Sequence, residues 1–205
     1  MTTDYEDAVA IGDLSVRLLR PSEPEELFAV AAEARGDAPY WAELWPCARA
    51  LASHLATLDL GGVRVLELGC GLALPSLVAA LRGAAVVASD VSADALERVA
   101  ESGRRTLGRP LETLCADLHE PSALIARGPF DLVLGADLLY DCTLATAMGA
   151  LIPQIAPAAL FAYAWKGSAI PLAEPLAAHG FRIAQWRPGG GGPRLFEAVL
   201  ATEPM

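Results

Sequence analysis

An alternation of apolar runs and helical patterns, from about residue 46 onward, most constrains how this chain can fold. The apolar runs predict strands at 63–68, 84–90, 111–117, 130–136 and 159–165, and the segments between them predict helices at 74–83, 92–105, 122–128 and 143–156. Strands and helices that alternate in this way form a parallel sheet with helices on both faces. These runs lack the alternation of apolar and polar residues, as expected for strands that are covered on both faces.

The two ends of the chain depart from this pattern. "FRIAQWR" and "LFEAVLA", joined by "PGGGGP", predict an antiparallel hairpin at one edge of the sheet. Residues 46–205 are therefore expected to form one doubly wound α/β domain, with a mostly parallel sheet and a C-terminal antiparallel hairpin strand. Residues 1–45 predict a strand at 14–21 and a short helix at 22–34, which form an N-terminal extension that packs on the core.

The charge of the chain limits its possible partners. A formal net charge of −10 repels phosphate backbones, so we expect no nucleic-acid partner. The one short basic cluster, Arg104, Arg105 and Arg109, reads as a solvated helix end. Lysine-bearing proteins or small amines suit an acidic surface better. No apolar run reaches the roughly 18 residues that span a bilayer, and the acidic N-terminus does not resemble a secretory signal. We expect a cytoplasmic monomer with no membrane contact.

The cysteines and histidines do not form a recognisable metal-binding pattern. No CxxC or HExxH spacing occurs, and the cysteines lie among apolar neighbours, which predicts free thiols in a reducing compartment and no metal site. Each histidine is expected at the surface or at a helix cap. The residues concerned are Cys47, Cys70, Cys115, Cys142, His54, His119 and His179.

The segment "VLELGCGLALPS" (65–76) predicts a cofactor site, because it combines a strand, a glycine turn and the start of a helix. Gly69 and Gly71 allow a tight turn and a close approach of the backbone to a ligand. Asp90 ends the next strand, where a carboxylate can accept hydrogen bonds from ribose hydroxyls. A nucleoside cofactor at the carboxyl ends of the strands is therefore expected.

The turn favours S-adenosylmethionine over NAD. The dinucleotide fingerprint G-x-G-x-x-G requires a third glycine, and Leu74 occupies that position. Glu67, two residues before the first glycine, would repel a pyrophosphate but attract a cationic amino-acid group. S-adenosylmethionine carries a sulfonium, an ammonium and an adenosine, and it has no phosphate.

These segments resemble a known family. "VLELGCGLALPSLVAALRGAAVVASDVS" is similar to motifs I and post-I of class I S-adenosylmethionine-dependent methyltransferases, which have a Rossmann-like fold. "YWAELWPCARALASHL" and "GADLLYD" resemble the seven-β-strand lysine methyltransferase-like group, which includes the electron-transfer-flavoprotein β-subunit lysine methyltransferase and bacterial relatives labelled nicotinamide N-methylase-like. The resemblance covers roughly residues 40 to 205.

The resemblance implies roles for the matching residues. Asp90 would hold the ribose, and the methionine part of the cofactor would be lined by Glu67, Gly69, Cys70 and Gly71.

Further contacts are implied around the rest of the cofactor. Asp117 would lie near the adenine, with Leu118 at a position where many relatives carry a tryptophan. Ala136 would touch the cofactor, and Trp45 would close over it. Trp41 is expected to be an ordinary core tryptophan.

"GADLLYD" (135–141) places an acid and a phenol at the end of a buried strand, facing the methyl group. A free lysine must lose its proton before it can attack, at a cost of roughly 4 kcal/mol at neutral pH. Burial and a neighbouring sulfonium both disfavour the ammonium, so the proton can leave as the amine docks. Asp137 can then orient the amine, and Tyr140 can wall the site or face a methylated ammonium. In the alternative interpretation Asp137 caps the following helix, and Tyr140 packs beside it.

The leading hypothesis is an S-adenosylmethionine-dependent N-methyltransferase that acts on a protein lysine and releases S-adenosylhomocysteine. A small-molecule amine or heterocycle remains an alternative acceptor. An NAD-dependent oxidoreductase is disfavoured by Leu74 and by the lack of a Tyr-x-x-x-Lys motif. An inactive cofactor-binding module is disfavoured by Asp90 and Asp137. The N-P-P-Y pattern of nucleobase methyltransferases is absent at residues 137–140.

Overall fold

The computed structural model describes residues 3–36, 38–165, 168–188 and 191–201. Its centre is a seven-stranded sheet in the order β5-β4-β3-β6-β7-β9-β8. The strands are β3 (Arg64–Leu68), β4 (Ala85–Asp90), β5 (Glu112–Cys115), β6 (Leu132–Ala136), β7 (Ala158–Tyr163), β8 (Phe181–Trp186) and β9 (Arg194–Leu200). The strands β3 to β7 pair in parallel, and β9 is antiparallel to both of its neighbours. The predicted α/β fold class is therefore confirmed.

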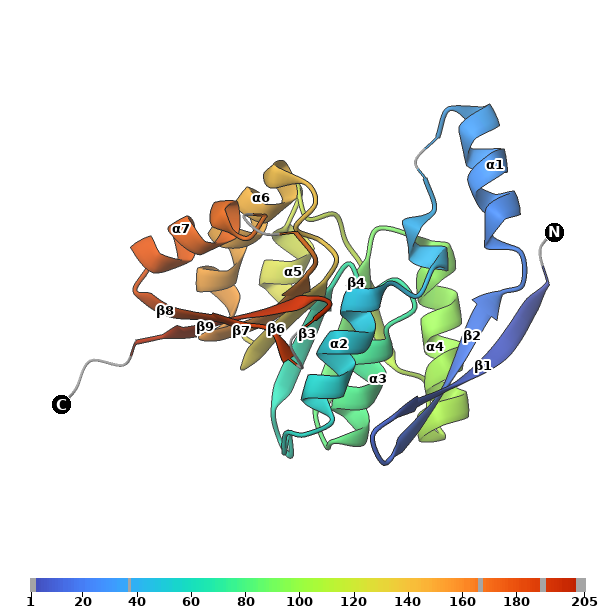
Figure 1. Cartoon of the computed structure of the whole chain (residues 1–205), viewed down its shortest axis with the longest axis horizontal. Coiled ribbons are helices and arrows are strands. Elements are labelled where there is room, and N and C mark those ends of the chain that lie inside the picture. Colours follow the sequence, from blue (N-terminus) through green and yellow to red (C-terminus); the bar gives the residue numbers. More distant parts are fainter. Residues whose placement is uncertain (1–2, 37, 166–167, 189–190, 202–205) are drawn as a thin grey trace.

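Helices cover both faces of this sheet (Figure 1). One face carries α2, α3 and α4, and the opposite face carries α5, α6 and α7. Their bounds are α2 (Pro46–Leu55), α3 (Leu74–Leu81), α4 (Ala93–Leu107), α5 (Ser122–Arg127), α6 (Cys142–Ile155) and α7 (Ile170–Ala178). Each face forms its own apolar core, with Leu51 and Leu77 on the first side and Leu124 and Met148 on the second. No described helix is long and apolar enough to cross a membrane.

The C-terminal hairpin forms at one edge of the sheet, as predicted. Within it β9 pairs with β7, so β8, which comes first in the sequence, is the outermost strand. The predicted glycine turn between them includes residues 189–190, which lie outside the described residues.

Side-chain contacts stabilise α4. Ser92 caps the helix by accepting a hydrogen bond from the Ala95 amide at 3.2 Å. On the same helix, Glu101 and Arg105 form an i,i+4 ion pair at 3.0 Å. The helix α7 and the strand β1 were not predicted.

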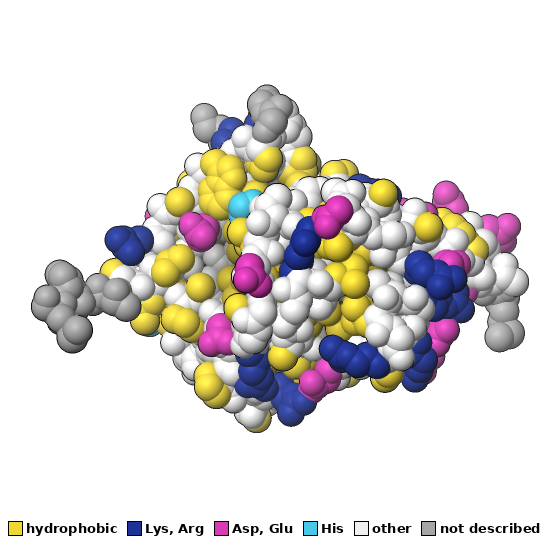
Figure 2. Space-filling view, turned by 90° about the horizontal axis from the view of Figure 1, so that it is seen from below, with side chains coloured by type: hydrophobic (Ala, Val, Ile, Leu, Met, Phe, Trp, Pro, Cys, Tyr) yellow, Lys and Arg dark blue, Asp and Glu magenta, His cyan; other side chains and the backbone are white. Residues whose placement is uncertain are grey.

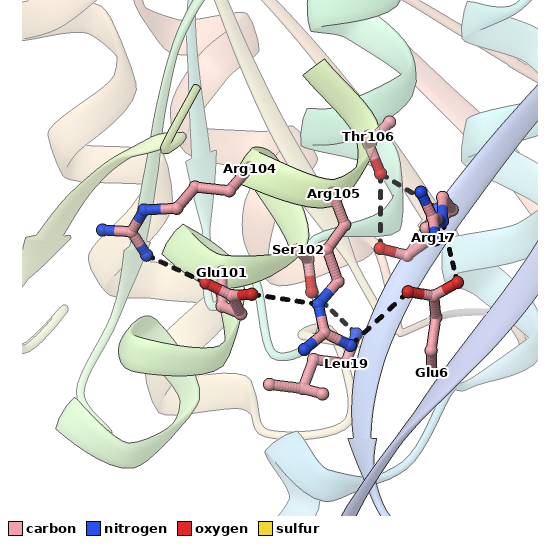
Figure 3. A network of polar contacts seen from close by, with 8 residues as sticks. All are labelled: Glu6, Arg17, Leu19, Glu101, Ser102, Arg104, Arg105 and Thr106. Carbon is pink, nitrogen blue, oxygen red and sulfur yellow. Dashed lines mark hydrogen bonds and ion pairs between the residues drawn. The ribbon is translucent and has the colours of Figure 1, made fainter. Parts of the chain in front are cut away.

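The N-terminal residues form a two-stranded sheet, β1 (Asp4–Ile11) and β2 (Leu14–Pro21), followed by α1 (Pro24–Ala34) and the short 3-10 helix η1 (Tyr40–Ala42). The hairpin lies along α4, and its inner side chains join the apolar core of that face. Figure 3 shows the polar contacts between the two. Hydroxyl groups of α4 accept hydrogen bonds from the free edge of β2: Ser102 from the Leu19 amide at 2.8 Å, and Thr106 from the Arg17 amide at 2.9 Å. The N-terminal edge strand is therefore attached to the domain by specific bonds.

Candidate active site

A cavity of about 1170 Å³ opens at the carboxyl ends of β3, β4, β5, β6 and β7. Every site residue predicted from the sequence lines it, which brings together Trp45, Glu67, Gly69, Cys70, Gly71, Asp90, Asp117, Leu118, Ala136, Asp137 and Tyr140. In a parallel sheet the loops that follow the strands converge at one edge, so residues far apart in sequence meet there.

The glycine turn after β3 needs both of its glycines. Gly69 and Gly71 have left-handed backbone angles, with φ of 53° and 50°, a region that L side chains rarely adopt. A Cβ at Gly69 would lie 2.5 Å from a methyl carbon of Leu138, and a Cβ at Gly71 would lie 3.4 Å from the carbonyl oxygen of Trp41. The absence of side chains lets Leu138 and the backbone of Trp41 pack closely against the turn.

Asp90 is held in place by two backbone amides. Its Oδ2 accepts from Gly71 and its Oδ1 accepts from Ser92, both at 2.9 Å. A carboxylate can accept about four hydrogen bonds, so capacity for two hydroxyl donors remains. The side chain is 8% exposed, and burial raises the pKa of Asp90. Its orientation and its remaining acceptor capacity suit a ribose.

Glu67 lies at the amino end of α3. Its Oε2 accepts the amide of Ser76 at 2.9 Å, and the N-cap residue, Ala73, makes no side-chain cap of its own. The side chain is 1% exposed. Burial is the main reason why the pKa of Glu67 rises to about 8, and the charge of Asp90 adds to it. A cation in the cavity would reverse this shift by favouring the carboxylate.

Asp137 follows β6 with a left-handed φ of 56°, a conformation that Asp tolerates better than most residues. Its Oδ2 accepts the amide of Cys47 at 3.0 Å, in the first turn of α2. Asp137 therefore caps α2. The following helix, α6, is capped by Asp141, which accepts from Thr143 at 2.7 Å. The alternative prediction, that Asp137 caps the following helix, is wrong.

Burial raises the pKa of the Asp137 carboxyl, although the bonds from Cys47 oppose the shift. Burial, with the nearby Asp137, raises the pKa of the Cys47 thiol above its usual range. The thiol therefore stays protonated at neutral pH. Both residues line the cavity, and Asp137 is the one of the pair that can carry a charge there.

Exposed aromatic rings surround the mouth of the cavity. The Tyr40 ring lies 6.1 Å from those of Trp45 and Tyr140, and 6.0 Å from that of Phe28. The Trp45 indole donates to the carbonyl oxygen of Tyr40 at 2.8 Å. Tyr140 is 68% exposed, and burial of its inner part, followed by the charge effect of Tyr40, raises its pKa. Large apolar surface exposed at a cavity mouth is typical of a binding site.

Four further aromatic residues in the cavity lining were not predicted: Tyr40, Trp41, Tyr163 and Trp165. Trp41 was expected in the core, but it is only half-buried and lines the cavity. Tyr40 precedes it in the same 3-10 helix. Trp165 follows β7 and is 79% exposed. The position of Trp165 after an apolar strand is the signal that could have revealed it, because the neighbouring strands also end in site residues.

The remaining predicted residues also line the cavity. Asp117 is exposed after β5 and accepts the His119 amide at 2.8 Å, while Leu118 packs partly against the apolar core. Ala136 ends β6, and the thiol of Cys70 is buried. All four cysteines are free, and among the described residues no group of His, Cys, Asp and Glu side chains could hold a metal ion.

Comparison with known proteins shows to which proteins this domain is similar. A methyltransferase domain family matches residues 65–156. The fold is similar to that of magnesium protoporphyrin IX methyltransferase from Synechocystis PCC 6803 with bound S-adenosylmethionine, with a TM-score of 0.61 and 21% identity over 89% of this chain and 86% of that chain. Residues 65–156 therefore match a methyltransferase domain, and the fold around them is similar to that of a methyltransferase that binds S-adenosylmethionine.

The sequence relatives agree with the group that the motifs of this chain resemble. The histone-arginine methyltransferase METTL23 of Xenopus laevis is 33% identical over 60% of this chain and 55% of its own length. The electron transfer flavoprotein beta subunit lysine methyltransferase of Xenopus laevis is 35% identical over 52% of this chain and 43% of its own length. The similarity to the lysine methyltransferase-like group is confirmed, and the chain spans about half the length of these relatives.

Proposed function

We propose that this protein transfers a methyl group from S-adenosylmethionine to a nitrogen atom of a protein, most specifically to a lysine side chain. The observation that carries this proposal is the position of Asp137. It lies in a cavity that contains the glycine turn and Asp90, and exposed aromatic rings surround the mouth. The acid can hold an amine, and the rings can hold an alkylated ammonium.

The cavity suits a cofactor that carries positive charge. Glu67 and Asp90 are both buried at the glycine turn, and each repels the other's ionised form. Their pKa values would fall back when a sulfonium or an ammonium lies nearby. Asp90 would receive the ribose hydroxyls, and the left-handed glycines would leave room for the chain of the methionine part. A pyrophosphate would be repelled by either acid in its ionised form and would not favour that form as a cation does, which disfavours NAD.

When bound, S-adenosylmethionine supplies an electrophilic methyl group on a sulfonium. Asp137 would accept an N–H bond from the incoming amine and direct its lone pair toward that carbon, which is catalysis by orientation. The transfer would form an N–C bond and break the S–C bond, and the electron pair of the broken bond would stay on sulfur. The amine releases its proton to Asp137 or to solvent.

A protein acceptor is supported by the names of the relatives. Both relatives described above are named as protein methyltransferases, one for arginine and one for lysine. Asp137 distinguishes the two acceptors only weakly, because it could accept N–H bonds from either. The lysine assignment rests on the motif that the chain shares with the lysine methyltransferase-like group. We also propose that the protein acts as a monomer and binds no nucleic acid. Acidic and basic side chains are interspersed on the face that Figure 2 shows.

The test is incubation of the protein with isotope-labelled S-adenosylmethionine and a cell lysate, followed by mass spectrometry of labelled peptides. Label on lysine Nζ supports the proposal. Label on arginine, on small molecules or on RNA would show that the proposed acceptor is wrong. It would still support S-adenosylmethionine as the methyl donor. If no label appears although S-adenosylhomocysteine binds, the inactive binding module becomes the better hypothesis.

Asp137→Asn tests the role of the acid. Asn also tolerates the left-handed backbone, and its amide oxygen can still accept the Cys47 amide. We expect binding of S-adenosylhomocysteine to persist while turnover falls on the order of 10²-fold, because a charged contact in the transition state is lost. The control is Asp141→Asn, since Asp141 caps α6 and is absent from the cavity lining. Turnover of Asp137→Asn at the parent rate would show that Asp137 is only a helix cap.

A further inference from the structure

The cavity wall above the glycine turn comes from the N-terminal part of the chain. Trp41, in η1, lies with its backbone against Gly71, where a Cβ would meet its carbonyl oxygen at 3.4 Å and its Cα at 3.5 Å. Gly71 in turn donates its amide to Asp90. The position of Trp41 therefore affects the turn at which the cofactor site is built.

One side chain of the domain holds Trp41 in place. The guanidinium of Arg98, on α4, lies over the Trp41 ring at 5.0 Å from its centroid. Its Nε donates to Asp4 of β1 at 3.0 Å, and its Nη1 donates to the carbonyl oxygen of Asp94 at 2.9 Å. The Arg98 side chain is 19% exposed. Arg98 thus joins α4, the N-terminal hairpin and the cavity wall.

The segment between η1 and α2 has a second attachment at its other end. Asp137 accepts the Cys47 amide, and Trp45 donates to Tyr40 within the segment. The cavity wall is therefore held by Arg98 near its start and by Asp137 near its end. The planar guanidinium of Arg98 can make these contacts together, because it can stack on an indole ring and donate hydrogen bonds in its own plane at the same time.

We propose that Arg98 is a positioning residue for cofactor binding, and that it acts by holding Trp41 against Gly71. The β1–β2 hairpin then has a second role besides covering α4, because Asp4 of β1 orients Arg98, which holds the cavity wall in position. This inference rests on the proposed cofactor site, but it does not depend on which acceptor is methylated.

Calorimetric titration with S-adenosylhomocysteine tests the proposal. We expect Arg98→Ala to weaken binding roughly 3- to 30-fold, the range that loss of a cation–π contact allows. Arg98→Lys should lose less affinity, because it keeps a cation near Asp4 and Trp41. The matched control is Arg104→Ala on the same helix, since Arg104 is 56% exposed and pairs only with Glu101 among the described residues. The control should bind like the parent.

A double-mutant cycle separates positioning from simple destabilisation. Trp41→Leu should weaken binding, and Arg98→Ala should then add little further loss, because the two residues act through one contact. Independent losses, or an Arg98→Ala variant that melts at a lower temperature but binds normally, would overturn the proposal. If Arg98→Ala does not fold, Arg98→Lys and Asp4→Asn carry the test, and parent affinity in both would overturn it. Failure of the parent protein to bind would instead count against the cofactor site.

Discussion

Replacing Glu67 with Gln should change how the stability of the protein depends on pH. Glu67 is 1% exposed, and its pKa is about 8 in the folded protein against an ordinary value of 4.5. The folded state therefore keeps a proton that the unfolded chain releases in this interval. Because the folded-state pKa is the higher one, stability from this group is present at low pH and is lost as pH rises toward 8.

The pKa shift sets the size of the expected effect. Each unit by which the folded-state pKa exceeds the unfolded-state pKa changes the free energy of unfolding by at most about 1.4 kcal/mol. The parent protein therefore loses on the order of 3 kcal/mol of stability by pH 7. Gln has nearly the same shape, does not titrate, and its amide oxygen can still accept the Ser76 amide. The free energy of unfolding of Glu67→Gln, relative to the parent, should therefore rise between about pH 5 and pH 8.

The assay is urea unfolding of both proteins at several pH values across that interval. Glu101→Gln is the control, because the pKa of Glu101 is lowered, mainly by the bond from Arg105. Stability from a carboxyl of that kind is present above its unfolded pKa and is lost only in acid, so its difference from the parent should stay flat. Parallel curves for the parent and Glu67→Gln would refute the reasoning, because Glu67 would then be ionised in the folded protein.

Three further outcomes are expected. Asp90→Ala should weaken binding of S-adenosylhomocysteine by about 1.5–3 kcal/mol in calorimetry, since it removes charge-assisted acceptors; unchanged affinity would exclude Asp90 from the site. Gly69→Ala should lower the free energy of unfolding by about 1–3 kcal/mol in urea titration, through backbone strain and the contact with Leu138. Gly12→Ala should cost less, because φ is similarly 59° but no atom lies within 4 Å of the new Cβ. S-adenosylhomocysteine should raise the melting temperature while NAD leaves it unchanged, and a shift with NAD would contradict the choice of cofactor.

The parallel part of the fold was predictable because each covered strand must be apolar on both faces, and each helix must show one apolar face. The strand β1 was missed because acidic residues such as Asp4 and Glu6 occupy its exposed half, while only Val9 and Ile11 reach the core. The helix α7 was missed because Pro175 interrupts its pattern.

The order of the last two strands could not be predicted from local sequence patterns. The pattern predicts that the two strands of the hairpin pair with each other, but it does not predict which of them also pairs with β7. Burial decides the outcome, because Leu195 and Phe196 of β9 are fully buried on successive positions, whereas β8 is largely exposed. The site shows the same limit. Residues at strand ends were predictable, but Trp41 reaches the cavity from a segment that carries no strand or helix pattern.

The acids of the site each join two parts of the structure. Glu67 of β3 accepts an amide of α3, and Asp137 after β6 accepts an amide of α2. Both helices begin without a side-chain cap from their own N-cap residue. A helix amino terminus favours the ionised form of a nearby carboxylate, which partly offsets the cost of burying it. These helices thus hold two acidic side chains in one cavity, and a cation that enters it would favour the ionised form of both.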